Sequence, residues 1–448
     1  MMNTTAHTHS VVAGLGRTGA SCVRYLLRRG VRVAVTDSRA APPGLAELER
    51  QAGGLDMRLG GFDLSLLEGA SQLLLSPGIS LREPIATRAR ERGIEVLGDI
   101  ELFARAASAP VVAVTGTNGK STVTTLVAQM AAADGRRVLA GGNLGEPALD
   151  LLEQPAPDLY VLELSSFQLE TTHKLQLLGG VVLNVSADHM DRYDSLASYA
   201  AAKARLLRHA ATAVLNLDDP LVAAMRRAGQ PTLTYSLSSR RADFTLLDTV
   251  RGPALARRGE ALLPVSRLKI TGLHNAANAL AALALGESAG LSRAGMLSAL
   301  ENFEGLPHRS QWVAEVQGVA YVNDSKGTNV GATLAAAQGS RTPLVLIAGG
   351  DGKQQDFAPL AQGLRGRVHD AVLIGRDAPA IEAALAGVCR THRAASLPEA
   401  VRKASQVANP GDTVLLSPAC ASLDMFRDYA QRGEVFAQAV RALAQERA

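Results

Sequence analysis

The stretch VVAVTGTNGKSTVTTLVAQM, from Val111 to Met130, decides the fold class of this chain. It opens with VVAV, a short apolar run rich in β-branched residues, which is typical of a buried strand. It closes with TVTTLVAQM, which has the composition of a helix. Between them, TGTNGKST places glycines, a lysine and hydroxyl residues at a strand-to-helix turn. A strand, such a turn and a helix form the elementary unit of a parallel α/β sheet.

The turn has the chemistry of a phosphate-binding loop. Its backbone amides, the Lys120 ammonium and two hydroxyls can together hold a triphosphate and its Mg²⁺. The general loop carries a glycine where this chain has Val114, and Gly116 follows slightly later, so we expect a shorter variant. The alternative is a glycine-rich turn with an exposed lysine. The predicted nucleotide-binding residues are Gly116, Thr117, Asn118, Gly119, Lys120, Ser121 and Thr122.

The same alternation of short apolar runs and longer helical patterns continues on both sides of this stretch. It predicts an α/β protein of three domains, and 448 residues that are 47% hydrophobic can bury several cores. We expect a Rossmann-like domain over residues 1–98, a P-loop ATPase-like central domain with a parallel sheet over 99–305, and a Rossmann-like domain over 306–448. Between Thr232 and Ile270, short alternating runs with Gly and Pro turns predict a small antiparallel sheet attached to the central domain.

Composition argues against several classes of function. The formal net charge is only +4 and the basic residues form no long block, so we expect no nucleic acid partner. Cys22, Cys389 and Cys420 follow no disulfide or metal-ligand spacing, which fits a reducing cytoplasm. The longest segment without a charged residue, Ile270 to Gly286, contains histidine and asparagine, and the first ten residues do not read as a signal peptide. We therefore expect a cytoplasmic protein with no membrane partner.

A second glycine motif, GLGRTG, follows the first predicted strand. Its glycines, Gly14, Gly16 and Gly19, precede the acidic Asp37 at the end of the next strand, which is the context of a dinucleotide fingerprint. Amides at a helix N-terminus favour glycine where an anion approaches closely. Three interpretations fit these residues: an NAD site, a site for another phosphate-bearing nucleotide, and a tight turn without a ligand.

Polar residues also follow the strands that come after the phosphate loop. Glu163 ends an otherwise apolar run, and a buried carboxylate needs a cation. His189 follows the next run at the carboxyl edge of the sheet, where open α/β sheets bind ligands. A histidine alone is more often structural, but its place beside a phosphate loop favours a ligand role. Lys203 lies in an Ala-rich helix, SYAAAKARLL, and nothing local distinguishes it from a solvent-facing lysine.

Further candidates lie in the second half of the chain. In GLHNAANALAALALG, Asn275 and Asn278 share one face of a predicted helix, and Asn275 is equally suited to cap it or to contact a base. LPHRSQ then brings Arg309 to the start of the third domain. NDSKGTN, AGGDGK and SPACASLD follow three predicted strands, so their lysines and hydroxyls should meet at one sheet edge and suit an anionic acceptor. These residues are Asp324, Lys326, Thr328, Lys353 and Ser422.

Together the motifs resemble the Mur ligases of peptidoglycan synthesis. The resemblance rests on TGTNGKST, LELSSFQLE, LNVSADHMDRY, LKITGLHNAANALAALAL, GLPHRSQ, NDSKGTN, GGDGK and LLSPACASLDMF in this order, and it covers nearly the whole chain. LSSFQLE and SPACASLD are typical of the branch that joins D-glutamate to UDP-N-acetylmuramoyl-L-alanine with ATP. The DNPR motif of the diaminopimelate- or lysine-adding branch is absent.

The resemblance implies small-molecule substrates, a monomer, and one domain each for the UDP-sugar, ATP and the amino acid. The first glycine motif would then bind UDP. The residues implied at the UDP-muramoyl substrate are Thr18, Asp37, Ser38, Gly78 and Asn143. Those implied at ATP, besides the phosphate loop, are Asn275, Asn278, Arg309 and Asp324. Those implied at glutamate are Thr328, Lys353, Ser422 and Tyr429.

The family further implies Mg²⁺, as two ions, and an acyl-phosphate intermediate. Lys120 would hold the β and γ phosphates, and Lys203 matches a lysine that the family carbamylates with CO₂, which turns a cation into a carboxylate-like metal ligand. The implied metal ligands are Ser121, Glu163, His189 and the carbamylated Lys203. The implied catalytic residues are Lys120, Glu163, His189, Lys203 and Arg309.

Several alternatives stay open at the level of sequence. An L-glutamate-adding variant uses the same residue types, and a folylpolyglutamate-type ligase also joins glutamate to a carboxylate, although LSSFQLE and SPACASLD do not favour it. An NAD-dependent oxidoreductase explains GLGRTG but leaves TGTNGKST without a role. A non-catalytic nucleotide-binding regulator needs only the phosphate loop and gives no reason for Glu163, His189 and Lys203.

Overall fold

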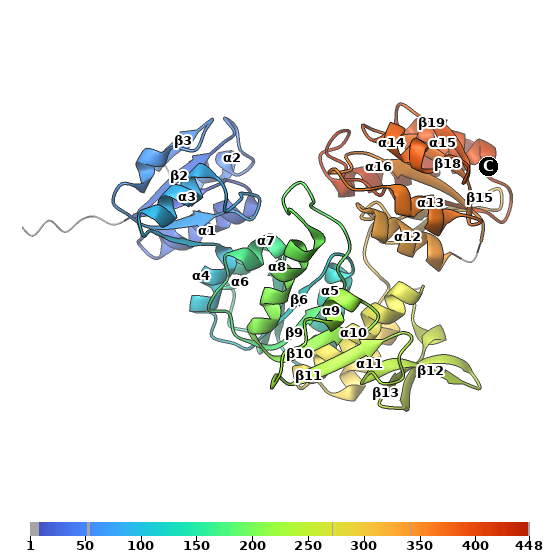
Figure 1. Ribbon diagram of the computed structural model, residues 1–448, viewed down its shortest axis with the longest axis horizontal. Helices are drawn as coiled ribbons and strands as arrows, with labels where there is room; N and C mark the ends of the chain where they lie inside the picture. The colour runs from blue at the N-terminus through green and yellow to red at the C-terminus, as the bar shows by residue number, and fades with distance from the viewer. Residues whose placement is uncertain (1–8, 52–53, 271, 341, 447–448) are drawn as a thin grey trace, which may run out of the picture.

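The computed structural model describes residues 9–51, 54–270, 272–340 and 342–446. Within them the chain forms three units, each built on one sheet with helices on its faces (Figure 1). The first unit (blue) and the third (orange to red) lie on opposite sides above the central unit (green to yellow). The predicted α/β class with three units and mainly parallel sheets is confirmed.

The first unit is a five-stranded parallel sheet in the order β3-β2-β1-β4-β5. Because β1 lies at its centre and the chain winds to both sides, the loops after β1, β2 and β4 leave from the same edge. The elements are β1 (His9–Ala13), α1 (Arg17–Arg28), β2 (Val33–Asp37), α2 (Leu45–Gln51), β3 (Asp56–Leu59), η1 (Leu64–Leu67), β4 (Ala70–Leu75), α3 (Pro84–Glu91) and β5 (Glu95–Leu97).

The central unit contains a nine-stranded sheet in the order β14-β13-β12-β11-β10-β9-β6-β8-β7. Its helices and the strands up to β10 are α4 (Asp99–Ala106), β6 (Val111–Thr115), α5 (Lys120–Ala133), β7 (Val138–Gly142), α6 (Ala148–Leu151), β8 (Leu159–Glu163), α7 (Ser166–Glu170), β9 (Leu177–Val182), α8 (Leu196–Arg208), β10 (Ala210–Asn216), α9 (Pro220–Ala223), α10 (Leu273–Ser288) and α11 (Arg293–Asn302).

The short strands predicted between Thr232 and Ile270 do not form a sheet of their own. They are β11 (Thr232–Ser236), β12 (Phe244–Thr249), β13 (Gly252–Arg257) and β14 (Glu260–Pro264), followed by η2 (Val265–Arg267). β11 and β12 extend the central sheet in parallel, and only the β12-β13 and β13-β14 pairs are antiparallel. β11 can pair with β10 because the edge of β10 has unpaired backbone N–H and C=O groups. The turns after β12 and β13 are tight, and two strands joined by a tight turn can pair only in the antiparallel sense.

The third unit is a six-stranded sheet in the order β15-β16-β20-β17-β18-β19, parallel except for the β15-β16 hairpin. Its elements are β15 (Gln311–Val316), β16 (Val319–Asn323), α12 (Val330–Gly339), β17 (Leu344–Gly349), α13 (Ala358–Leu364), β18 (Val368–Ile374), α14 (Ala378–Ala384), β19 (Arg390–Arg393), α15 (Leu397–Val407), β20 (Thr413–Leu416) and α16 (Tyr429–Glu446).

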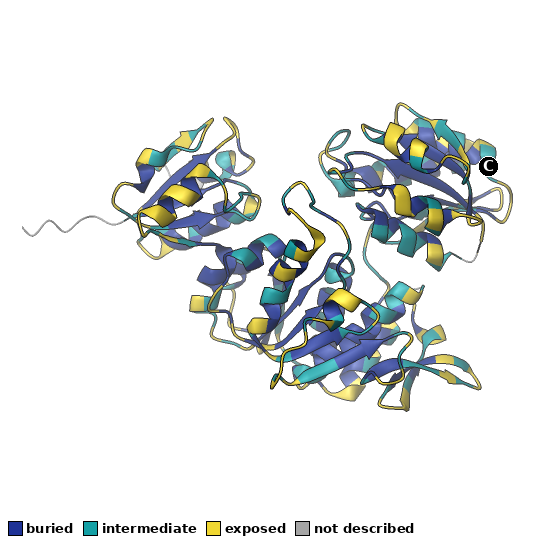
Figure 2. Ribbon diagram, in the orientation of Figure 1, coloured by how far each residue is buried: buried dark blue, intermediate teal, exposed yellow. Residues whose placement is uncertain are grey.

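The order of the central strands determines which loops meet. β6 lies between β8 and β9, with Val114 opposite Glu163 and Thr115 opposite Val182. The phosphate loop after β6, the end of β8 and the loop after β9 therefore leave the sheet side by side. Parallel strands such as β6 and β8 are covered by helices on both faces and are therefore buried. Figure 2 shows buried residues along the strands of the three sheets.

The first and central units share apolar packing through α4. Leu97, Ile100 and Phe103 belong to one buried cluster with Tyr160 and other central residues. The Phe103 and Tyr160 rings meet edge to face, with their centroids 5.1 Å apart. This pair fastens α4 to the central sheet, and the same cluster includes Leu74 and Leu97 of the first unit, so a continuous core joins the two units.

A buried carboxylate reinforces the attachment of α4 to the rest of the central unit. Glu101 in α4 is fully buried, and its Oε2 accepts hydrogen bonds from the backbone N–H groups of His173 (2.7 Å) and Lys174 (2.9 Å). Burial favours the neutral acid, but these two bonds and one from Arg105 outweigh it and hold the pKa of Glu101 below its ordinary value. The carboxylate form is therefore the one that the fold stabilises.

We expect Glu101→Gln to lower the free energy of unfolding by about 1–3 kcal/mol at pH 7. The NH₂ group of the glutamine would face an N–H donor that the carboxylate now accepts from, so one hydrogen bond would be lost. A carboxyl whose pKa is lowered by folding contributes stability above its unfolded pKa, about 4.3, and loses it as the pH falls through the folded-state pKa. The difference between wild type and variant should therefore stay nearly constant from pH 7 to about pH 5 and narrow as the pH falls below about 4.3. Chemical denaturation followed by circular dichroism checks this, and equal stability at pH 7 contradicts it.

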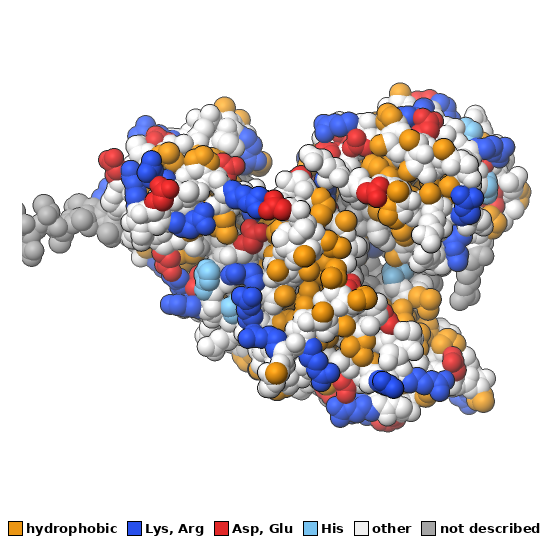
Figure 3. Space-filling model, viewed as in Figure 1, with side chains coloured by type: hydrophobic (Ala, Val, Ile, Leu, Met, Phe, Trp, Pro, Cys, Tyr) orange, Lys and Arg blue, Asp and Glu red, His pale blue; other side chains and the backbone are white. Residues whose placement is uncertain are grey.

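The surface carries both signs of charge. On the face in Figure 3, Lys and Arg side chains are scattered over all three units with Asp and Glu among them. The same view is hollowed between the first and third units, above the central one. Within the described ranges, no helix combines the length and the apolar character that crossing a membrane requires.

Candidate active site

The phosphate loop joins β6 to α5, as the sequence predicts. Gly116 and Gly119 have φ values of 150° and 84°, which a residue with a side chain rarely adopts. A Cβ atom on Gly119 would lie 2.4 Å from Asn278 Oδ1. The loop therefore needs glycine for its conformation and for the close approach of α10.

The Lys120 ammonium lies over its own loop. Its Nζ donates to the carbonyl oxygens of Gly116 (3.0 Å) and Thr117 (2.9 Å). Burial lowers the pKa of Lys120, and the charges of Arg309 and Lys353 lower it further, against the opposing effect of Glu163 and Asp188. Several cations thus surround the loop. A bound triphosphate would offset the repulsion between them.

Glu163, the last residue of β8, is a buried carboxylate with one unused oxygen. It is 2% exposed, its Oε1 accepts from Asn143 Nδ2 at 2.6 Å, and its Oε2 has no hydrogen-bond partner. A buried unpaired oxygen of this kind fits a cation. In the described part of the chain, no three His, Cys, Asp or Glu side chains gather into a metal site of their own. Mg²⁺ commonly takes one or two carboxylates and completes its shell with phosphate oxygens and water, so Glu163 and the Ser121 hydroxyl fit such an ion.

Lys203 does not face solvent. It is 1% exposed, its Nζ donates to the Gly116 carbonyl at 2.8 Å, and it lies 4.2 Å from the centre of the Tyr199 ring. Burial lowers its pKa far below the ordinary value for lysine, and the charge of Lys120 adds to this effect. The open question left by the sequence is resolved: this lysine lies against the phosphate loop.

His189 lies in the loop between β9 and α8, in a left-handed backbone conformation with φ of 57°. Burial lowers the pKa of its imidazole to about 4, so the ring is neutral at physiological pH, and a neutral ring can ligate a metal. The neighbouring Asp188 pairs with Lys353 of the third unit at 3.0 Å. Burial opposes ionisation of Asp188, but Lys353, His189 and Lys120 outweigh it and lower the pKa of this carboxyl.

Two residues that the sequence does not single out join the third unit to the phosphate loop. Asn329, the N-cap of α12, exchanges side-chain hydrogen bonds with Asn118 at 3.1 and 3.2 Å, and donates to Asp188 at 3.3 Å. Asp188 stands next to a predicted ligand, which is the only signal that could have found it. Asn329 has the pattern of an ordinary helix N-cap, so the sequence does not indicate that it belongs to the site.

Arg309 crosses from the third unit to the loop and donates from Nη2 to Ser121 Oγ at 2.7 Å. A cavity of about 330 Å³ opens beside this contact. Among its lining residues are Asn118, Gly119, Thr122, Asn275, Asn278, Arg309 and Asp324. Asp324 is buried, which raises the pKa of its carboxyl to about 6 although it accepts hydrogen bonds from Ser417 and Ser310. The structure thus brings seven of the eleven residues predicted at ATP to one cavity, whereas Gly116, Thr117, Lys120 and Ser121 are not among its lining residues.

The residues predicted at glutamate are less closely assembled. Lys353 reaches Asp188, and the Tyr429 ring lies 3.8 Å below the Lys326 ammonium. Burial lowers the pKa of Lys326 to about 8. Ser422 is buried in its own loop, where its carbonyl accepts from Met425 and Phe426. Among the described residues no side-chain hydrogen bond joins Thr328 or Ser422 to the phosphate loop.

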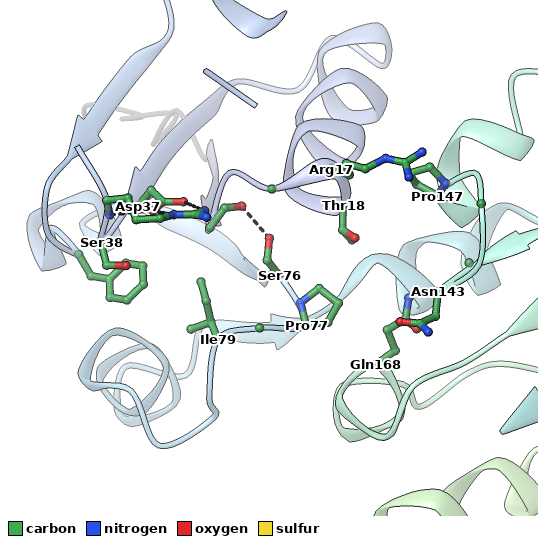
Figure 4. Close-up of a pocket in the computed structure, with 17 residues that line it drawn as sticks. Arg17, Thr18, Asp37, Ser38, Ser76, Pro77, Ile79, Asn143, Pro147 and Gln168 are labelled. Carbon is green, nitrogen blue, oxygen red and sulfur yellow. Dashed lines mark hydrogen bonds and ion pairs between the residues drawn. The ribbon is translucent and has the colours of Figure 1, made fainter. Parts of the chain in front are cut away.

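A second cavity, of about 470 Å³, lies between the first and central units. Figure 4 shows Asp37 and Ser38 at one end, Asn143 and Gln168 at the other, and Thr18 and Pro77 between them. Asp37 is held by the Leu15 N–H at 2.6 Å and by Arg39. Every residue predicted at the UDP-muramoyl substrate lines this cavity: Thr18, Asp37, Ser38, Gly78 and Asn143. Asn143 also donates a hydrogen bond to Glu163, so it connects this cavity with the end of β8, beside the strand that leads into the phosphate loop.

Three family models match the chain in succession. They are a Mur ligase MurD-like N-terminal domain over residues 8–98, a Mur ligase middle domain over 114–286, and a Mur ligase glutamate ligase domain over 308–420.

Curated relatives match over nearly the full length. The UDP-N-acetylmuramoylalanine--D-glutamate ligase of Nitrosococcus oceani is 54% identical over 437 residues, which are 97% of this chain and 96% of that protein. The ligase of the same name from Pseudomonas aeruginosa is 51% identical, covering 97% of this chain and 98% of that protein. Among solved structures, the UDP-N-acetylmuramate-alanine ligase of Thermotoga maritima aligns with a TM-score of 0.61 at 19% identity, covering 98% of this chain and 100% of that one. At that identity it supports the fold alone.

Proposed function

Since the chain belongs to the Mur ligase family, we propose that it joins D-glutamate to UDP-N-acetylmuramoyl-L-alanine, with ATP converted to ADP and phosphate. The observation that carries the proposal is the contact between Asn143 and Glu163. Through a single 2.6 Å hydrogen bond it connects a cavity suited to a nucleotide-sugar with the carboxylate that ends β8, next to the strand that leads into the phosphate loop. A substrate that spans the two sites would present its far end to the terminal phosphate.

The reaction requires activation of a carboxylate, which is a poor electrophile because oxide is a poor leaving group. The L-alanyl carboxylate attacks the γ-phosphorus of ATP, the bond to the bridging oxygen breaks, and an acyl phosphate and ADP result. The glutamate amine then attacks the acyl carbon, phosphate leaves, and the amine loses a proton as the amide forms. Both steps concentrate negative charge on phosphoryl oxygens.

The residues around the loop suit this charge. Lys120 and Arg309 supply cations, and the backbone N–H groups at the start of α5 face the phosphates. Mur ligases use Mg²⁺, which neutralises phosphate charge when bound; Ser121 and Glu163 would hold one ion and His189 a second. Asn275, Asn278 and Asp324 would contact the rest of ATP in the smaller cavity.

We also infer that Lys203 is carbamylated. A buried lysine with a strongly lowered pKa is a neutral amine, and the neutral amine is the form that reacts with CO₂. The carbamate would add one negative charge beside Glu163 and so complete a site for a divalent cation. This interpretation explains why a lysine lies fully buried against a carbonyl of the phosphate loop.

The remaining assignments are part of the same proposal. The glutamate carboxylates bind to Thr328, Lys353, Ser422 and Tyr429. The third unit moves further over the site to bring these residues together, and this closure excludes water from the acyl phosphate.

The domain boundaries lie after residues 98 and 305. The protein acts as a monomer in the cytoplasm, on small molecules, without nucleic acid or membrane partners.

The test is phosphate release from ATP by the purified protein, measured with each substrate omitted in turn. We expect release only when UDP-N-acetylmuramoyl-L-alanine and D-glutamate are both present, because the second substrate removes the acyl phosphate. L-glutamate in place of D-glutamate should give no release above background. Release that needs neither substrate would contradict the proposal, and equal rates with both enantiomers would identify the alternative acceptor specificity.

A further inference from the structure

Arg192 belongs to the motif DHMDRY, and the chemistry above assigns it no role. It lies one turn after His189, and its backbone N–H donates to the His189 carbonyl at 3.0 Å. Its side chain is only 13% exposed. The side chain contacts the first unit, away from the triphosphate loop.

The Arg192 guanidinium holds a loop of the larger cavity. Nη1 donates to the Pro77 carbonyl at 3.2 Å, and Nη2 donates to the Ile79 carbonyl at 3.1 Å. These partners lie 115 and 113 residues away in the chain, in the other unit. Pro77 and Ile79 line the cavity between Asp37 and Asn143 (Figure 4). One side chain of the central unit thus fixes the loop after β4.

The same guanidinium is anchored to α7. Nη2 also donates to Glu170 Oε2 at 3.0 Å, and the guanidinium carbon lies 4.4 Å from the centre of the Phe167 ring. The Phe167 ring meets the His189 ring at a tilt of 65°, with centroids 4.9 Å apart. The aromatic ring is therefore shared between Arg192 and His189, and the next residue, Gln168, lines the cavity itself.

We infer that Arg192 is a positioning residue, which aligns a substrate bound in the larger cavity with His189 and the phosphate loop. The inference rests on the proposed function, because it takes that cavity to hold the UDP-muramoyl substrate. Such a substrate must extend from Asp37 past Asn143 to the triphosphate, and a displacement of about 1 Å at the reacting carboxylate can cost on the order of 100-fold in rate. A guanidinium suits the task because its fixed fork reaches two carbonyls at once, whereas an ammonium is a point charge.

The decisive variant is Arg192→Lys, which keeps a cation beside Glu170 and removes the fork. We expect a roughly tenfold rise in KM for the UDP substrate together with a roughly tenfold fall in kcat, and a KM for ATP within about twofold of wild type. Arg82→Lys is the matched control. Arg82 pairs with Asp194 across the same two units, but these side chains are 71% and 70% exposed, and we expect wild-type kinetics.

A purely structural role predicts a different result, because a smaller folded fraction lowers kcat and leaves every KM unchanged. That result, or wild-type kinetics in Arg192→Lys, would overturn the inference. Phe167→Leu is the second variant, should Arg192→Lys not fold: it removes the ring that Arg192 and His189 share, and it should raise the KM for the UDP substrate severalfold while the KM for ATP stays within about twofold of wild type. An unchanged KM for the UDP substrate in Phe167→Leu would also overturn the inference. Failure of the proposed function is recognised separately, since wild type would then show no turnover with this substrate.

Discussion

Replacing Lys203 by alanine is expected to lower kcat by roughly 10²–10³-fold, the size of effect seen when one preorganised electrostatic group is lost. Short carboxylic acids added to the assay should restore part of the activity. The reason lies in the position of Lys203, which is 1% exposed and whose Nζ is 2.8 Å from the Gly116 carbonyl. Formate or acetate can enter the space left by the side chain and supply the carboxylate that a carbamate would have supplied.

The proposed carbamylation predicts a pH dependence of the activity. In that reaction the Lys203 nitrogen would form a bond to the carbon of CO₂ and release one proton, which would give a carbamate with one negative charge. Burial lowers the pKa of Lys203, so the reactive neutral amine persists at lower pH than for an exposed lysine. Acidification reverses the reaction by returning the proton to nitrogen. We therefore expect wild-type activity to fall in CO₂-depleted buffer, and to fall sooner as the pH decreases.

Lys269→Ala is the matched control, because Lys269 is an exposed lysine paired with Glu304. It should keep wild-type kinetics and show no response to formate. Carbon NMR of the wild type under ¹³CO₂ should show one carbamate signal that the Lys203 variant lacks. Full activity in Lys203→Ala would remove the lysine from the mechanism. Inactivity without any rescue, together with no carbamate signal, would leave the lysine important but uncarbamylated.

Glu163→Gln is expected to give the second large loss, at least about 100-fold in apparent Mg²⁺ affinity. The glutamine side chain has the same shape, and its oxygen can still accept from Asn143 as Oε1 does at 2.6 Å. What disappears is the negative charge and the unused Oε2, which becomes an amide nitrogen. Since an unpaired buried charge is removed, the free energy of unfolding without Mg²⁺ should stay the same or rise. Activity and stability should thus change in opposite directions.

Glu101→Gln separates these two effects, because Glu101 is equally buried but satisfied by two backbone N–H groups. It should lower stability and leave the Mg²⁺ dependence unchanged. Phosphate release over a Mg²⁺ titration and denaturation without Mg²⁺ check both variants. A wild-type Mg²⁺ dependence in Glu163→Gln would show that this carboxylate does not hold the ion.

Much of this arrangement could be predicted from local sequence. The run Val111 to Met130 predicts a strand, a glycine turn and a helix, and the structure has β6, the phosphate loop and α5 in those places. GLGRTG predicts the turn into α1 and a nearby anion site. Polar residues at strand ends, such as Glu163, lie where parallel sheets place ligands. Each of these patterns depends on a few adjacent residues, so it can be recognised without knowing how the rest of the chain folds.

The misses have a common cause. The pattern between Thr232 and Ile270 predicts a small antiparallel sheet attached to the central domain. The β12-β13 and β13-β14 pairs are antiparallel, but β11 joins β10 in parallel, because the edge that a strand joins depends on strands far away in sequence. Locally, Lys203 is one polar residue of an Ala-rich helix, and only the resemblance to the Mur ligases marks it as a site residue. Asn329 has only the pattern of a helix cap. Arg192 shows no pattern of its own, because its partners Pro77 and Ile79 contribute only backbone carbonyls, which every residue possesses.

The sequence by itself determined the fold class, the phosphate loop and the family, because glycine conformations, apolar periodicity and ordered motifs are local properties of the chain. Only the tertiary structure decided which side chains share a site. It buried Lys203 against Gly116, left one oxygen of Glu163 without a partner, and brought Asn118 to Asn329 and Arg192 to the loop after β4. The physical reason is that burial, and with it charge state and reactivity, is set by neighbours that folding brings in from 87 to 211 residues away.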